Sequence, residues 1–143
     1  MVGLLLDTNA MVWFLAEEPM EDVALFAIAD AQAHNALFVS PITAWKASLA
    51  LSKPAARRPN LIGKDAATWF REGRRDMGAR LVPVGLQIAL EAARVPGVFG
   101  SGDPGDCYII ATARRRGLQV VTRDRPMMKL AGRLPGYLSV LAC

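Results

Sequence analysis

The sequence predicts an α/β fold in which one mainly parallel sheet of four to five strands lies between two layers of helices. Short apolar runs, typical of strands buried on both faces, alternate along the chain with longer segments of helical spacing. Two of these runs are followed by a carboxylate: Asp7 comes directly after residues 2–6, and Asp124 lies just beyond residues 118–121. Parallel strands place such ends at one edge of a sheet, where α/β proteins bind ligands.

Length and composition indicate a single domain spanning residues 1–143. Hydrophobic residues make up 52% of the chain, enough for a proper core, and mean hydropathy is +0.24. No apolar run approaches the roughly 18 residues of a membrane span, and the N-terminus lacks the basic start of a signal peptide. Two cysteines and one histidine form neither a disulfide framework nor a zinc set. We therefore expect a cytoplasmic protein without a membrane segment.

The first half of the chain predicts two strands and three helices. Strands are expected over residues 2–6 and 36–39, and helices over residues 10–18, 21–32 and 42–51. Ser40 and Pro41 form an N-cap and first-turn pair for the third helix. In that helix we expect Trp45 and Leu49 to face the core.

The second half begins with a basic loop and then continues the alternation of elements. Residues 53–64 carry two prolines, a glycine and four basic residues, which favours a loop that could clamp a substrate. A Pro-Gly turn is expected between Asp103 and Asp106, and the apolar helix that follows Asp106 ends at Gly117. The remaining elements are helices over residues 66–77, 86–94 and 126–131, and strands over residues 81–84, 118–121 and 137–141. Residues 100–105 formally match a dinucleotide-binding glycine motif, but a poor strand, an internal proline and two acids argue against it.

Charge is distributed unevenly along the chain. Residues 1–44 contain six acids and no lysine or arginine, whereas residues 45–143 contain all 17 basic residues and seven acids, a net charge of +10. Ordinary solvated helix faces would explain such clusters. A basic surface around an acidic pocket, as a nucleic-acid enzyme needs, would explain them equally well.

Aspartates are the residues with the clearest chemical potential. We expect Asp7, Asp106 and Asp124 to converge at the strand ends, with Asp103 nearer the rim. Clustered carboxylates repel one another and stay ionised only with a cation, and hard oxygen ligands suit Mg2+ or Mn2+. Such an ion activates water and stabilises charge on a phosphate during phosphodiester cleavage. The alternative is that these four acids are unrelated surface groups, and for Asp7 that it caps the helix that follows it.

Four motifs together resemble a PIN domain, and more narrowly the VapC toxins of bacterial toxin–antitoxin pairs. They are LLLDTN at residues 4–9, SPITAW at 40–45, DPGD-x-x-I-I-A-T-A at 103–113 and VVTRD at 120–124. The resemblance covers nearly the whole chain in the right order. It implies a metal-dependent endoribonuclease, usually a homodimer, that cleaves RNA and is neutralised by a VapB-like antitoxin. Its catalytic and metal-binding acids fall on Asp7, Asp106 and Asp124, and its supporting polar positions on Thr8, Asn9 and Thr122, with Asp103 beside them.

Lys46 is where the chain departs from this family. The resemblance places a glutamate directly after the tryptophan of the SPITAW segment, and this chain has lysine instead. The exchange changes the site by two charges, and an ammonium cannot ligate a metal. We therefore predict a salt bridge from Lys46 to Asp7 or Asp106, and very low ribonuclease activity. Glu17 and Glu18 are the nearest candidates to compensate for the missing acid.

Two other functions remain open at this point. Lys46 favours a catalytically inert PIN-fold module that binds RNA or antitoxin without cleavage. A phosphotransferase with Asp7 as nucleophile is disfavoured, because that chemistry needs a second aspartate where Asn9 stands.

Partner contacts can also be predicted. Apolar residues of the early helices exceed what one small core requires, so some should line a dimer or antitoxin contact; these are Met11, Trp13, Phe14 and Phe26. Candidates for contacts with RNA are four arginines expected around the acidic pocket, Arg57, Arg58, Arg123 and Arg125.

Overall fold

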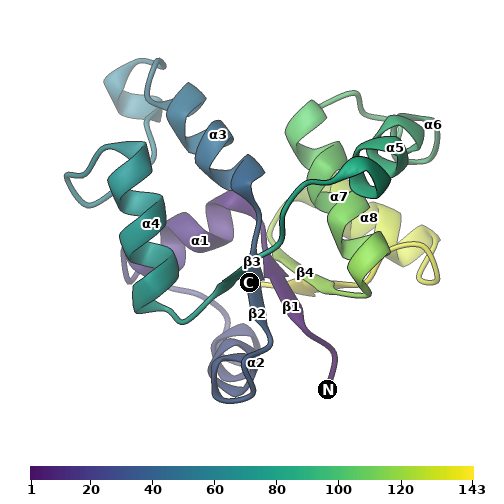
Figure 1. The fold of residues 1–143 in the computed structure, drawn as a ribbon, viewed down its shortest axis with the longest axis horizontal. Helices are drawn as coiled ribbons and strands as arrows, with labels where there is room; N and C mark the ends of the chain where they lie inside the picture. Colours follow the sequence, from purple (N-terminus) through teal and green to yellow (C-terminus); the bar gives the residue numbers. More distant parts are fainter.

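A computed structural model describes the whole chain, residues 1–143, as alternating strands and helices (Figure 1). The elements in order are β1 (Leu4–Leu6), α1 (Thr8–Leu15), α2 (Asp22–Ala33), β2 (Leu37–Val39), α3 (Pro41–Ala50), the 3-10 helix η1 (Ala55–Arg57), α4 (Ala66–Asp76), β3 (Arg80–Leu81), α5 (Leu86–Arg94), α6 (Pro96–Phe99), α7 (Pro104–Arg116), β4 (Gln119–Thr122), α8 (Arg125–Arg133) and β5 (Val140–Ala142). None of the helices combines the length and the apolar composition that a membrane span requires.

The sheet has five strands in the order β3-β2-β1-β4-β5, and every neighbouring pair is parallel. The first strand lies at the centre, with Leu5 in register with Phe38 of β2 and Val120 of β4. All strands therefore end at the same edge. This arrangement confirms the predicted parallel sheet and places the residues that follow β1 and β4 side by side.

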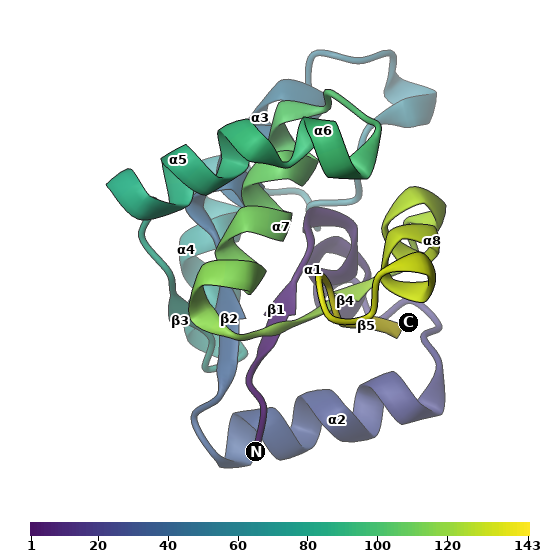
Figure 2. The ribbon, with the colours of Figure 1, turned by 90° about the vertical axis from the view of Figure 1, so that its right-hand side faces the viewer.

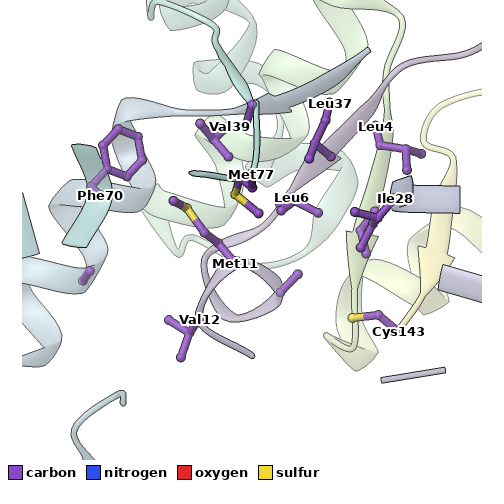
Figure 3. Packing of buried hydrophobic residues seen from close by; sticks show 14 of the residues in the cluster. Leu4, Leu6, Met11, Val12, Ile28, Leu37, Val39, Phe70, Met77 and Cys143 are labelled. Atoms are coloured by element: carbon purple, nitrogen blue, oxygen red, sulfur yellow. The ribbon is translucent and has the colours of Figure 1, made fainter. Parts of the chain in front are cut away.

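Alternate residues of the central strands face opposite helix layers. Leu4 and Leu6 belong to a core cluster with α1, α2 and α4, part of which Figure 3 shows. Leu5 belongs to a second cluster with α5, α7 and α8. Figure 1 shows α1 and α4 on one side of the sheet and α5 to α8 on the other, while α2 runs along one end of the sheet in Figure 2. Burial on both faces explains why the strand sequences are apolar without alternation, and it confirms the three-layer fold.

Three elements of the second half differ from the sequence-based expectation. The helix expected after Asp106 begins at Pro104, so the residues of the predicted Pro-Gly turn form its first turn instead. The third strand is Arg80–Leu81 rather than residues 81–84. Pro83 has no N–H to continue a ladder, so pairing stops early on this edge strand. Residues 96–99, to which the sequence analysis assigned no helix, form the short helix α6, with Pro96 in its first turn.

The expectation that Trp45 and Leu49 face the core is wrong. Their exposed fractions are 45% and 51%. Thr43 and Ala47 form the buried face of α3 instead. Two residues along a helix is a rotation of about 200°, so a buried 43/47 pair turns 45 and 49 outward. The small side chains allow α3 to pack closely against its neighbours, and this proximity outweighs the preference of tryptophan for the core.

The apolar residues of the early helices divide between core and surface. Met11 is fully buried, and Trp13 and Phe14 are half-buried against the first core cluster. Phe26 of α2 is 75% exposed. Of the four residues predicted to line a partner contact, only Phe26 is thus fully available on the surface.

Candidate functional site

A pocket of about 280 Å³ opens at the carboxyl edge of the sheet, beside the ends of β1 and β4. We call it the acidic pocket. It brings together the four aspartates that the sequence analysis selected, which confirms their predicted convergence. Its lining residues are Asp7, Thr8, Asn9, Trp13, Lys46, Asp103, Asp106, Ile109, Arg123 and Asp124.

Asp7 is the most buried carboxylate of the pocket, with an exposed fraction of 7%. It follows β1 and caps α1, because its Oδ1 accepts a hydrogen bond from the backbone N–H of Ala10 at 2.8 Å. The Thr122 hydroxyl at the end of β4 donates a very short hydrogen bond to its Oδ2. Thr122 also accepts a hydrogen bond from the N–H of Asp124 at 2.9 Å, so it joins the acids that follow the two strands.

Helix capping positions two more of the acids. Asp124 caps α8 through Met127, and Asp103 caps α7 by accepting from the N–H of Asp106 at 3.0 Å. Capping was the alternative interpretation of Asp7, and the structure shows that Asp7, Asp103 and Asp124 all cap helices while they line the pocket. Since each cap uses one carboxylate oxygen, it orients the side chain and leaves the other oxygen available.

Asp106 and Asp103 differ in depth as predicted. The side chain of Asp106, in the first turn of α7, is 19% exposed, and that of Asp103 is 48% exposed. Lys46 reaches both from the second turn of α3. Its Nζ lies 2.9 Å from Oδ1 of Asp106 and 4.0 Å from Oδ1 of Asp103. The predicted salt bridge is therefore present, and its partner is Asp106 rather than Asp7.

Burial and charge shift the titration of these groups in a consistent way. Burial raises the pKa of Asp7 to about 6, against the lowering effect of its hydrogen bonds from Thr122 and Ala10. Burial also raises the pKa of Asp106, which Lys46 opposes. Burial would lower the pKa of Lys46, but the hydrogen bond and charge of Asp106 outweigh it and raise that pKa. We infer that Lys46 and Asp106 are both charged at neutral pH, because the ammonium lies directly against the carboxylate.

The side chains as placed do not fit a divalent cation. Although four carboxylates share the pocket, no three His, Cys, Asp or Glu side chains are grouped so that they could hold a metal ion. The ammonium of Lys46 lies among these carboxylates, 2.9 Å from Asp106, and its positive charge would repel a cation. Glu17 and Glu18 are exposed and do not line the pocket, so they do not compensate for the missing acid.

Arg123 lines the pocket, but its guanidinium is already engaged. It lies 3.8 Å from the centre of the Trp13 ring and donates to the carbonyls of Pro19 at 2.7 Å and Cys143 at 3.2 Å. These contacts tie the α1–α2 loop and the end of β5 to the residue before Asp124. The structure thus gives Arg123 a positioning role that the sequence did not suggest.

The other predicted residues fall into two groups. Thr8 and Asn9 line the pocket, and the Thr8 hydroxyl donates to that of Thr43 at 3.4 Å. The arginines Arg57, Arg58 and Arg125 are exposed and lie outside the lining of the pocket.

Two lining residues were missed by the sequence analysis, Trp13 and Ile109. Ile109 follows Asp106 by three positions and therefore shares its helix face, a spacing that could have identified it. Trp13 carried no comparable signal, because its place depends on the contact with Arg123.

Comparisons with solved structures find this fold in bacterial toxin–antitoxin complexes. VapBC2 from Rickettsia felis, bound to a promoter DNA fragment, matches at a TM-score of 0.69 with 14% identity, covering 98% of each chain. DNA-bound VapBC from Salmonella typhimurium matches at 0.66 with 18% identity, covering 99% of this chain and 98% of that one. FitAcB from Neisseria gonorrhoeae matches at 0.61 with 23% identity, covering 96% of each.

Sequence comparison identifies the family. No curated protein sequence matches the chain significantly. The sequence pattern of the PIN domain, however, matches residues 4–133, which include all four aspartates of the acidic pocket and every strand except β5. The chain therefore belongs to the PIN domain family.

Proposed function

We propose that this PIN domain is the ribonuclease toxin of a VapBC-like pair, in a form whose metal-dependent cleavage Lys46 suppresses. Its partners would be a VapB-like antitoxin, a second copy of the chain and RNA. Family membership and the toxin–antitoxin complexes among the structural relatives support the coarse assignment. The observation that carries the finer one is the 2.9 Å ion pair between Lys46 and Asp106 inside the acidic pocket.

The ion pair explains how the chain folds around four acids without an added cation. The ammonium neutralises Asp106 and lies within 4.0 Å of Asp103, so it reduces the repulsion among the carboxylates. PIN nucleases usually use Mg2+ or Mn2+, which supplies an activated water for phosphodiester cleavage when bound. A lysine at position 46 cannot contribute to such a site. We therefore expect the chain to bind RNA and antitoxin while cleaving RNA very slowly.

We assign the catalytically inert alternative to the chain with Lys46, which would bind RNA or antitoxin without cleavage. The same ion pair between Lys46 and Asp106 favours this assignment. A phosphotransferase with Asp7 as nucleophile is opposed by the pocket. Both oxygens of Asp7 accept hydrogen bonds, from Ala10 and Thr122, which lowers their nucleophilicity, and Asn9 stands where that chemistry needs a second aspartate.

Cleavage of a structured RNA tests the proposal. The chain with Lys46, its Lys46→Glu variant and the double variant Lys46→Glu with Asp7→Asn would each be incubated with the RNA and Mg2+ or Mn2+. We expect cleavage from Lys46→Glu alone, with loss in the double variant and in EDTA. The matched control is Lys46→Gln, which removes the ammonium without adding a ligand and should stay inactive. Cleavage by the chain with Lys46 at the rate of the glutamate variant would refute the role assigned to the lysine.

A further inference from the structure

The outward face of α3 carries an unexpected aromatic residue beside the acidic pocket. Trp45 and Leu49 are about half exposed, one helical turn apart. They line a second hollow of about 280 Å³, here called the α3 groove. Exposed tryptophan in a concave surface marks a binding site more often than chance, because its large apolar face gains from being covered. The full lining is Trp45, Lys46, Leu49, Ala50, Lys53, Asp103 and Pro104.

The α3 groove continues directly into the acidic pocket. Lys46 and Asp103 line both hollows, since they stand between Trp45 on one side and Asp106 on the other. A flexible polymer with one unit in the acidic pocket would therefore place the next unit against Trp45.

Positive charge collects at the far end of the α3 groove. Lys53 lines it, and the following loop carries Arg57 and Arg58, both exposed. The Nε of Arg58 donates to the carbonyl of Lys53 at 2.7 Å, which folds the loop back onto the end of α3. An anionic polymer is repelled by the four aspartates, so it needs cations of this kind beside them. An aromatic face next to cations matches a nucleic-acid single strand, whose bases stack and whose phosphates are attracted to lysine and arginine.

We propose that the α3 groove holds an unpaired nucleotide of the RNA, next to the bond presented to the acidic pocket. Its base would stack on Trp45, and the neighbouring phosphates would contact Lys53 and Arg58. This inference rests on the proposed function and extends it to a substrate class. The RNA must be single-stranded at this position, as in a loop or a bulge, because a base within a duplex has both faces covered by its neighbours.

Binding without metal tests the inference separately from cleavage. The chain with Lys46 would be titrated in EDTA with an RNA hairpin of unpaired loop and with a fully paired duplex of equal length. We expect the chain to bind the hairpin more tightly than the duplex. Trp45→Ala should lower the affinity for the hairpin by roughly tenfold, which is within the usual range for one stacked base. Trp45→Phe keeps an aromatic face and should retain most of the affinity. Leu134→Ala, which removes an exposed apolar side chain at the end of α8, is the control and should bind normally.

Three results of these binding measurements would contradict the inference. Equal affinity for hairpin and duplex, or normal hairpin binding by Trp45→Ala, would overturn the inference. The inference would also fail if Trp45→Ala changed the chain from a dimer to a monomer in sedimentation while RNA binding stayed intact. A second copy of the chain would then be the molecule that covers the groove.

Cleavage by the glutamate variant separates the inference from the proposed function. If Lys46→Glu cleaves RNA and adding Trp45→Ala leaves KM unchanged, the inference fails and the proposed function stands. If Lys46→Glu does not cleave but hairpin binding still depends on Trp45, the proposed function fails and the RNA contact stands.

Discussion

The stem of Lys46 lies across Gly105 in the first turn of α7. A Cβ at Gly105 would stand 2.5 Å from Cδ of the lysine and 3.0 Å from its Cγ and Cε. Such distances are far below an ordinary van der Waals contact, so the glycine leaves the space through which Lys46 reaches Asp106. The ion pair therefore depends on a neighbour that carries no charge.

Gly105→Ala should displace the lysine without unfolding the protein. The added methyl group meets a flexible side chain, which can move away at the cost of its contact with Asp106. The pKa of Lys46 should then fall, because the raising effect of Asp106 is lost. Stability should fall by no more than about 1–3 kcal/mol, because Asp106, whose side chain is 19% exposed, loses its counter-charge, while alanine gains roughly 0.5–1 kcal/mol in a helix. An NMR titration of the lysine side chains measures the pKa.

Gly132→Ala is the matched control for this substitution. Gly132 lies in α8, and a Cβ there meets nothing within 4 Å. We expect it to stabilise the protein by roughly 0.5–1 kcal/mol and to leave the pKa of Lys46 unchanged. An unchanged Lys46 pKa in Gly105→Ala would contradict the packing argument.

Thermal unfolding should show that a divalent cation stabilises the chain only when residue 46 is acidic. Without metal, Lys46→Glu adds a carboxylate beside Asp106 and Asp103 and should lower Tm. Mg2+ should then restore it, since a ligand at about 100 times its Kd adds about 2.7 kcal/mol. Lys46→Gln should respond little. An equal rise in Tm for the chain with Lys46 would show that the lysine does not exclude the cation.

Ionisation of Asp7 should destabilise the folded protein above about pH 6. Its pKa is about 6 when folded and 3.8 as a free side chain, so between these values the folded state binds more protons than the unfolded state. The contribution of Asp7 to stability is therefore fully present below about pH 4 and is lost as the pH rises through 6. Since one pKa unit corresponds to about 1.36 kcal/mol, ionisation of Asp7 should lower the free energy of unfolding by about 2–3 kcal/mol at most.

Asp7→Asn tests this pH dependence because an amide does not ionise. Its free energy of unfolding relative to the original chain should rise between pH 4.5 and pH 7.5, as measured in urea. Asp65→Asn provides a control of opposite sign. Hydrogen bonds from Thr68 lower the pKa of Asp65, so its stabilising effect is present at neutral pH and is lost as the pH falls. A constant difference between Asp7→Asn and the original chain would rule out a raised Asp7 pKa.

Arg123→Ala should reduce stability more than it reduces RNA binding. The substitution removes the stack on Trp13 and the hydrogen bonds to Pro19 and Cys143, which together are worth roughly 1–3 kcal/mol. Arg125→Ala, two residues along, removes a side chain that makes no hydrogen bond or ion pair, and it should change stability by less than about 0.5 kcal/mol. Urea unfolding and hairpin titration measure both effects. Equal stability of the two variants would show that the contacts of Arg123 contribute little.

Much of the fold could be predicted from the sequence because it depends on local chemistry and on a simple rule of topology. Residues 4–6 and 120–121 are apolar because both faces of their strands are covered, and such runs are visible without a structure. Parallel strands then place Asp7 and Asp124 at one edge whatever the details of the helices. The convergence of the acids followed from these two facts. The salt bridge at Lys46 was predicted because the resemblance to the PIN domain places this lysine among the acids.

Side-chain directions were decided only by the tertiary structure. Trp45 faces outward because Thr43 and Ala47 let α3 approach its neighbours, which depends on how three helices fit together. Lys46 pairs with Asp106 rather than Asp7, because its stem passes over Gly105 while Asp7 is already held by Thr122 and Ala10. The sequence by itself thus determined which charges meet at the sheet edge. The packing between helices, which no local pattern encodes, decided which atoms touch.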